Sequence, residues 1–166
     1  MLIVLFGLPG AGKNYIGELI KKNYGYYFFD ADTLLTPGMN KSIRNGIPVT
    51  ERQFDGFFRL IIKRAKLLKR RYSNIVLTQS FRQEKHRLLF KKAFPDVRFV
   101  LIKAPVDLIE QRLRKRRHVV TPAYAKKIRR LFEKPTVKHD TILNDGVRKK
   151  LFRQLDNALS AHRRHG

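Results

Sequence analysis

A glycine-rich turn between an apolar run and a helix limits the possible folds of this chain more than any other part of its sequence. The run Leu2–Phe6 is short and continuous, which is typical of a strand buried on both faces of a parallel sheet. It leads into a stretch that fits G-x-x-x-x-G-K followed by a polar residue, and an amphipathic helix is predicted next, over 13–24. In this strand–turn–helix context the pattern forms a phosphate-binding loop.

The residue types in this turn each suit an anion. Glycines let backbone N–H groups turn inward around a phosphate, where a side chain would clash. The positive N-terminus of helix 13–24 faces the same anion, and the Lys13 ammonium can reach the β- and γ-phosphates of a nucleotide. The residues predicted to bind the nucleotide are Gly7, Leu8, Pro9, Gly10, Ala11, Gly12, Lys13 and Asn14.

Asn14 departs from the usual form of the motif. The last position is normally Ser or Thr, whose hydroxyl holds Mg²⁺. An amide oxygen can also ligate Mg²⁺, but the Asn side chain is longer, and Mg²⁺ tolerates distorted geometry poorly. Two interpretations therefore stay open: the site accommodates the amide, or phosphoryl transfer is weak or absent.

Two carboxylates follow the second predicted strand, 26–29. Asp30 and Asp32 are two residues apart at the carboxyl end of that strand, the edge at which such sheets bind ligands. Phosphorylating a hydroxyl needs one carboxylate to orient it and accept its proton, and another to anchor Mg²⁺. We take Asn14 and Asp30 as candidate metal ligands. The alternative is that Asp30 or Asp32 caps a helix that begins near Thr33, which would not exclude catalysis.

A basic run ends the helix predicted over 105–116. Arg112 and Arg116 are four residues apart and so share one helix face. Paired guanidinium groups suit the charge on transferring phosphate oxygens, and a hinged segment here would exclude water, which competes as phosphoryl acceptor. The alternative interpretation is general basicity at a helix C-terminus, which the helix dipole favours.

Strand and helix predictions alternate along all 166 residues. The further strands are predicted at 74–79, 97–103 and 141–143, and the further helices at 51–71, 83–93, 105–116, 122–133 and about 146–163. This alternation implies an α/β fold with right-handed crossovers and a parallel sheet that carries helices on both faces. Because no repeat or long linker divides the chain, we expect one domain over 1–166.

The composition adds one positive expectation and two exclusions. The chain has 37 Lys and Arg against 13 Asp and Glu, a formal net charge of +24, so it should bind polyanions such as nucleic acid non-specifically; a solvated basic surface is the alternative. It has no cysteine, which excludes disulfides and thiol chemistry. No apolar run approaches the roughly 18–20 residues that span a bilayer, so we expect a cytoplasmic protein. We expect it to be either a monomer or a homodimer.

Together these residues resemble the gluconate kinase family of small carbohydrate kinases, within the shikimate and adenylate kinase-like group of P-loop kinases. The resemblance runs along roughly residues 2–145 and includes the loop and the Asp30–Asp32 pair. Residues 46–52 are similar to the family pattern G-x-P-L-x-D-x-R, and the stretch from Ser80 to Arg87 is similar to S-A-L-K-x-x-Y-R. The family's lid pattern, R-L…R…H-F…L-E-x-P, is matched over about 112–135.

The resemblance implies a three-layer fold with a five-stranded parallel sheet in 2-3-1-4-5 order. It also implies ATP and Mg²⁺ as cofactors and transfer of the γ-phosphoryl group to a hydroxyl of a small sugar acid. On the matching positions, Lys13 would hold the phosphates and Asp32 would contact the acceptor hydroxyl. Arg112 and Arg116 would close on ATP, and Arg87 would help to bind an anionic acceptor.

The chain departs from the family pattern at several positions, among them Asn14, Thr36 in place of His, Asp55 in place of Trp and Gln83 in place of Lys. They motivate a second hypothesis, a non-catalytic or weakly active nucleotide-binding protein. The charge motivates a third, a polynucleotide 5′-hydroxyl kinase.

Overall fold

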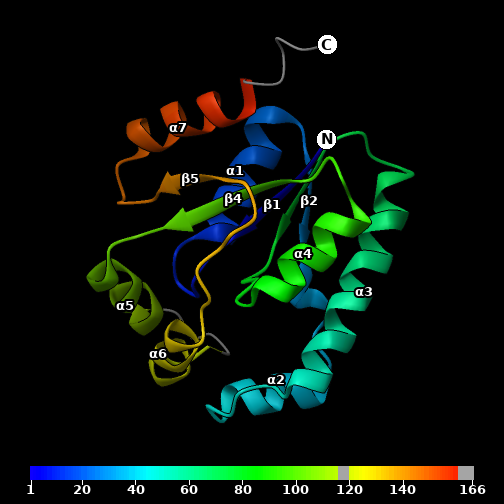
Figure 1. Ribbon diagram of the computed structural model, residues 1–166. Coiled ribbons are helices and arrows are strands. Elements are labelled where there is room, and N and C mark those ends of the chain that lie inside the picture. The colour runs from blue at the N-terminus through cyan, green and yellow to red at the C-terminus, as the bar shows by residue number, and fades with distance from the viewer. Residues whose placement is uncertain (116–119, 161–166) are drawn as a thin grey trace.

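A five-stranded parallel β-sheet organises the chain in the computed structural model, which describes residues 1–115 and 120–160. The strands are β1 (Leu2–Phe6), β2 (Tyr27–Asp30), β3 (Ile75–Thr78), β4 (Arg98–Lys103) and β5 (His139–Leu143). Their order in the sheet is β2-β3-β1-β4-β5, and every pairing is parallel (Figure 1). The predicted α/β fold with a 2-3-1-4-5 sheet is therefore confirmed.

Helices cover both faces of this sheet, which makes three layers. They are α1 (Lys13–Tyr24), α2 (Pro37–Arg44), α3 (Glu51–Lys69), α4 (Glu84–Ala93), α5 (Val106–Lys115), α6 (Pro122–Arg130) and α7 (Arg148–Ser160), with a short 3-10 helix η1 (Ala31–Leu34) after β2. Helices α1 and α7 lie on one side of the sheet, and α3 and α4 lie on the other (Figure 1). No helix within the described residues is both long and apolar enough to cross a membrane.

The central strand β1 divides its side chains between two cores. Leu2 and every second residue after it pack in the cluster that contains side chains of α3 and α4. The residues between them pack in the cluster that contains side chains of α1 and α7. All five residues of β1 are at most 2% exposed, which confirms the strand buried on both faces that the continuous apolar run predicted.

Two of the differences from the sequence-based prediction concern helices at the edge of the sheet that carries the loop. Helix α2 was not predicted, although Thr36 accepts a hydrogen bond from the backbone N of Met39 at 3.2 Å and Pro37 takes the first helical position, both common at helix starts. Helix α6 ends at Arg130 rather than at 133. The chain turns there because the backbone N of Glu133 donates to the carbonyl oxygen of Arg82 at 2.8 Å, which ties this segment to the start of α4.

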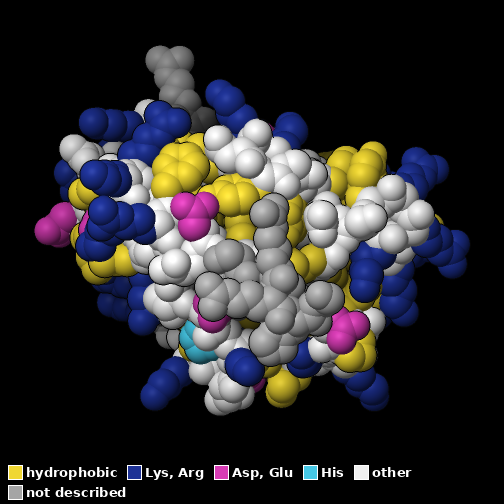
Figure 2. Space-filling view, turned by 90° about the horizontal axis from the view of Figure 1, so that it is seen from above, with side chains coloured by type: hydrophobic (Ala, Val, Ile, Leu, Met, Phe, Trp, Pro, Cys, Tyr) yellow, Lys and Arg dark blue, Asp and Glu magenta, His cyan; other side chains and the backbone are white. Residues whose placement is uncertain are grey.

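Basic side chains lie around the rim of one face of the molecule, and acidic ones are few there. Figure 2 shows Lys and Arg projecting around the edges of this face, with scattered Asp and Glu between them. On this face the basic side chains do not form a single stripe, which agrees with a solvated basic surface.

Candidate active site

The loop that joins β1 to α1 has the backbone that its sequence predicted. Gly7, Gly10 and Gly12 have φ angles of 138°, 82° and 97°, a region that residues with side chains rarely adopt. A Cβ on Gly7 would lie 2.4 Å from the carbonyl oxygen of Ile102, and one on Gly12 would lie 2.2 Å from Nδ2 of Asn144. Conformation and close packing both require glycine, and together they keep the loop curled as a phosphate-binding loop must be.

Lys13 folds back over this loop. Its Nζ donates to the carbonyl oxygens of Gly7 at 3.1 Å and Leu8 at 3.0 Å. The ammonium therefore lies over the loop at the N-terminus of α1, where the helix dipole also favours an anion. This position suits the phosphate contact predicted for Lys13.

Arg112 of α5 and Asn144, which follows β5, brace the loop from outside. Arg112 donates from Nη1 to the carbonyl oxygen of Ala11 at 3.3 Å and from Nη2 to Oδ1 of Asn144 at 3.3 Å. Asn144 is buried and donates from Nδ2 to the same Ala11 carbonyl at 2.9 Å. Sequence reasoning found Arg112 but missed Asn144, whose only signal was a polar residue directly after a strand. Arg116, the second arginine of that prediction, lies outside the described residues.

A cavity of about 310 Å³ opens beside this brace. It is lined by Gly12, Tyr15, Arg112, Asn144, Gly146, Arg148 and Leu151. Its volume is at the lower end of the range for small-molecule sites, and two arginines with one tyrosine ring give it both charge and an aromatic surface. The loop and this cavity are contiguous, because Gly12 belongs to both.

A chain of hydrogen bonds connects the loop to the ends of β2 and β3. Asn14 donates from Nδ2 to Oδ2 of Asp30 at 2.6 Å, and the backbone N of Asp32 donates to Oδ1 of Asp30 at 3.0 Å. Gln79, directly after β3, donates from Nε2 to Oδ1 of Asp32 at 2.7 Å. The capping interpretation is thus correct for Asp30, which caps η1, and this capping holds the two carboxylates at the same edge of the sheet.

Asn14 and Asp30 fit Mg²⁺ by the chemistry of their oxygens. Because Nδ2 is the atom of Asn14 that faces Asp30, the amide Oδ1 is the atom left for a cation. Within the described residues, no three His, Cys, Asp or Glu side chains gather closely enough to hold a metal by themselves. One or two protein oxygens completed by phosphate and water is the usual arrangement for Mg²⁺ at a nucleotide site.

Beyond Asp32 lies a second group that sequence reasoning missed, made of Arg82, Tyr124 and Phe54. The guanidinium carbon of Arg82 lies 4.4 Å from the centroid of the Phe54 ring. Burial raises the pKa of the Tyr124 phenol above its ordinary value. The positive charge of Arg82 opposes this rise, and the negative charge of Asp32 adds to it. The Tyr124 phenol of α6 is therefore within the electrostatic influence of both charges.

Arg87 does not reach this group, which corrects the prediction that it contacts an anionic acceptor. Its side chain is 0% exposed, and it donates to the carbonyl oxygens of Phe81 at 2.7 Å and Glu133 at 2.9 Å. Its Nε donates to Glu84. The guanidinium thus ties α4 to the segment after α6, and the physical reason for the correction is that all three nitrogens are engaged inside the fold.

Comparison with known proteins agrees with this geometry. A protein-family model described as an AAA domain matches residues 2–135, which include the loop, both carboxylates and Arg112. The chain belongs to this AAA domain family.

Curated relatives match this AAA-domain protein over a short stretch. The shikimate kinase of Moorella thermoacetica is 38% identical over 66 residues, which are 38% of this chain and 35% of that protein. The chloroplastic shikimate kinase 1 of Arabidopsis thaliana is 50% identical over 36 residues, 22% of this chain and 12% of that protein. The match thus spans about a third or less of the curated relatives' length.

Solved structures match over nearly the whole chain. A sugar kinase from Janibacter sp. HTCC2649 has 21% identity, covers 96% of this chain and 92% of its own, and has a TM-score of 0.81. A gluconokinase from Sinorhizobium meliloti 1021 has 22% identity, coverages of 99% and 97%, and a TM-score of 0.76. A shikimate kinase from Acinetobacter baumannii has 22% identity, coverages of 97% and 94%, and a TM-score of 0.62. The resemblance predicted from the motifs is confirmed for the fold, which these kinases share.

Proposed function

We propose that this AAA-domain protein is an ATP-dependent kinase that phosphorylates a hydroxyl group of a small sugar acid of the gluconate kind. The observation that carries the proposal is the hydrogen-bond chain from Asn14 through Asp30 to Asp32. These hydrogen bonds hold Asp32, the candidate proton acceptor, beside the phosphate-binding loop. A phosphate-binding loop alone indicates only a nucleotide, whereas a carboxylate held next to it supports transfer to an acceptor.

The nucleotide would lie along the loop and the adjoining cavity. Its phosphates would face the backbone N–H groups and Lys13, and its nucleoside would lie in the cavity between Tyr15, Arg112 and Arg148. Both regions meet at Gly12, where a Cβ would clash with Asn144. A substitution at Gly12 would therefore disturb the phosphate and nucleoside regions together.

In the proposed reaction, the acceptor hydroxyl gives its proton to Asp32, and its oxygen forms a bond to the γ-phosphorus. The bond from that phosphorus to the β–γ bridging oxygen breaks, and ADP leaves with its electron pair. Gln79 orients Asp32 through the 2.7 Å hydrogen bond, while Lys13 and Arg112 offset the charge on the phosphate oxygens. Asn14 and Asp30 would hold Mg²⁺ together with nucleotide oxygens, and the bound ion would neutralise charge on the phosphates.

Helix α6 would cover the acceptor. Lys127 of α6 donates to the carbonyl oxygen of Gly46, after α2, at 2.8 Å, so these two helices meet at the edge of the sheet that carries the site (Figure 1). The Tyr124 phenol on the same helix is within the electrostatic influence of Asp32. The contact between Lys127 and Gly46 supports the lid role predicted for about 112–135, because a helix held there would shield the acceptor side from water.

An ATP-consumption screen tests the proposal. Purified protein with Mg²⁺ is given gluconate, other sugar acids, shikimate, nucleoside monophosphates or a 5′-hydroxyl oligonucleotide, and ADP release is recorded against a no-acceptor control. We expect a sugar acid to stimulate turnover at least tenfold, with the phosphorylated product visible by mass spectrometry. The proposal would be contradicted if only the oligonucleotide stimulated ADP release, or if none of the acceptors did.

A further inference from the structure

Arg82 carries a buried guanidinium, two of whose nitrogens lack a hydrogen-bond partner among the described residues. Its side chain is 4% exposed, and the two nitrogens are Nε and Nη1. Arg87, five residues later, is equally buried but has all three nitrogens engaged. Burying a charge without a partner is costly, and native proteins rarely retain such a group without a use for it.

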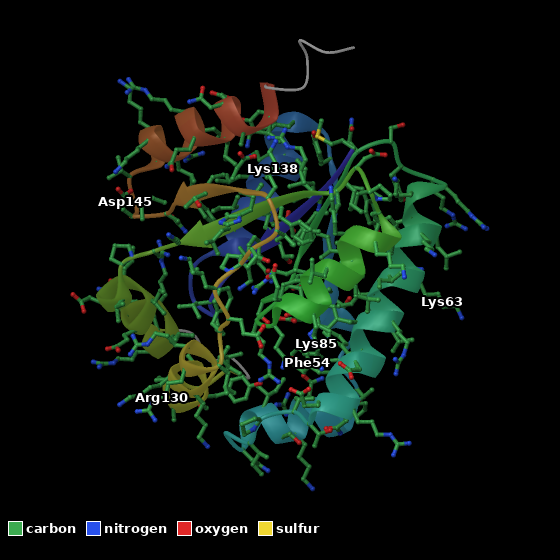
Figure 3. The ribbon with its side chains drawn as sticks, in the orientation of Figure 1. Phe54, Lys63, Lys85, Arg130, Lys138 and Asp145 are labelled. Carbon is green, nitrogen blue, oxygen red and sulfur yellow. The ribbon has the colours of Figure 1, made fainter. Side chains whose placement is uncertain are left out.

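The surroundings of Arg82 hold it in place without using its donors. The guanidinium carbon lies over the Phe54 ring, 4.4 Å from its centroid, and this cation–π contact uses neither the Nε nor the Nη1 donor. Phe54 belongs to the end of α3 that lies beside α4 (Figure 3). The carbonyl oxygen of Arg82 accepts from the backbone N of Glu133, so its backbone is fixed as well.

Arg82 also lies in the segment between β3 and α4 that reaches Asp32. Gln79, three residues before Arg82, donates from Nε2 to Oδ1 of Asp32 at 2.7 Å. The charges of Arg82 and Asp32 both act on the Tyr124 phenol of α6, which agrees with this placement. Arg82 stands where the pattern S-A-L-K-x-x-Y-R has Leu, so the charge is a feature of this chain and not of the resemblance.

We propose that Arg82 binds the carboxylate of the phosphoryl acceptor and thereby selects acids over neutral polyols. The inference rests on the proposed function, because the acceptor is the molecule that Asp32 activates. A guanidinium matches a carboxylate in shape and charge through two parallel N–H bonds. A neutral polyol would leave the buried charge unpaired, so we expect discrimination of about 100-fold or more against it.

Gluconate and sorbitol form a matched pair of probes, since they differ at one end of the chain only, a carboxylate against a hydroxymethyl group. Thermal unfolding is recorded with a non-hydrolysable ATP analogue present, so that the phosphate-binding loop is filled. Each probe is then added to wild type, Arg82→Leu, Arg82→Lys and the control Arg59→Leu. Arg59 is exposed on α3, so its substitution removes the same charge away from the site.

We expect gluconate, but not sorbitol, to raise the unfolding temperature of the wild type and of Arg59→Leu. Arg82→Leu should lose this shift, while its own unfolding temperature without gluconate should equal or exceed that of the wild type, because an unpaired buried charge is removed. Arg82→Lys should keep only part of the shift. Inorganic phosphate, as a further probe, distinguishes a carboxylate site from a general anion site: an equal Arg82-dependent shift with phosphate would overturn the assignment to a carboxylate.

A purely structural role makes the opposite prediction. Arg82→Leu would then unfold at a lower temperature and still be stabilised by gluconate, and that result would overturn the proposal. The proposal would also be overturned if gluconate did not raise the unfolding temperature of the wild type, or if it raised that of Arg82→Leu by the same amount. If instead the proposed kinase function fails, the ATP analogue will stabilise no variant, whereas an Arg82-dependent gluconate shift will remain.

Discussion

Two arginines on the same short stretch have opposite roles because their nitrogens meet different partners. Arg87 donates to two carbonyl oxygens and Glu84, and its charge serves the fold. Arg82 has a ring beneath it and no hydrogen-bond partner at Nε or Nη1 among the described residues. The role that we infer for each arginine therefore depends on which of its N–H donors the fold leaves without a partner. The residue type alone does not show which donors these are.

Replacing Asp32 by Asn should separate turnover from nucleotide binding. The amide keeps the shape of the side chain but cannot accept the acceptor's proton, so we expect turnover to fall by about 10²–10⁴-fold. ATP affinity should change little, because Asp32 lies beside the loop and not in it. Steady-state kinetics and calorimetry measure the two quantities. Asp96→Asn, an exposed acid before β4, is the control, and equal turnover in both variants would remove Asp32 from the mechanism.

Replacing Asn14 by Ser tests the departure from the usual loop motif. The shorter hydroxyl loses the 2.6 Å hydrogen bond to Asp30 but restores the ligand that Mg²⁺ usually has at this position. We expect Mg²⁺-dependent turnover to be preserved or raised, as measured by titrating Mg²⁺ at fixed ATP. A large fall would show that the site is built around the amide.

At the scale of elements, the start of α4 anchors the end of the lid segment. Glu84 accepts from the backbone N of Thr136 at 3.0 Å and of Val137 at 2.8 Å, and Arg87 donates to it. Its own backbone N donates to Glu133 at 2.6 Å. These bonds connect α4 to the stretch between α6 and β5, so the acceptor-side helix is fixed at one end.

The same carboxylate predicts how stability depends on pH. Burial alone would raise the pKa of Glu84, but hydrogen bonds from Thr136, Arg87 and Val137 outweigh it, so the pKa lies below its ordinary value of 4.5. A lowered pKa in the folded state contributes stability above pH 4.5, which is lost as the pH falls through the folded-state pKa.

Glu84→Gln should therefore lower the free energy of unfolding at neutral pH by about 1–3 kcal/mol. It should also weaken the acid dependence below pH 4.5. Denaturant unfolding at pH 7 and pH 4 measures both effects. The control is Glu18→Gln, an exposed acid on α1, and a Glu84 variant that behaves like this control would contradict the anchor.

The sequence predicted the fold better than the site, for a physical reason. Strand and helix periodicity, the loop glycines and the Asp30–Asp32 spacing are local, and local patterns predicted the sheet and the edge where ligands would bind. Asn144, Gln79 and Arg82 come together only because separate strands end at the same edge, and their one local signal is that they are polar residues at or shortly after the end of a strand. The unpredicted α2 is different, because its start, Thr36 followed by Pro37, is a local helix-start signal in the sequence.

At the scale of the whole molecule, the net charge of +24 requires a test of its own. If the basic surface is only solvated, binding to an oligonucleotide should be weak. A polynucleotide-binding protein should instead lose affinity steeply as salt rises from 50 to 200 mM, by about 10³-fold if six phosphates are contacted. Phosphorylation of a small acid should change far less over the same range. Fluorescence anisotropy and the turnover assay provide the comparison. Tight oligonucleotide binding with this steep salt dependence, accompanied by 5′-phosphorylation, would favour the polynucleotide kinase hypothesis instead.

Calorimetric titration with a Mg²⁺-bound, non-hydrolysable ATP analogue tests most directly whether the loop holds a nucleotide. Wild type and Lys21→Met, an exposed lysine on α1, should both bind with a single saturable site. Lys13→Met should bind at least about tenfold more weakly, since it loses a charged contact worth about 1.5–3 kcal/mol. No saturable heat in the wild type, or equal affinity in Lys13→Met, would contradict the account.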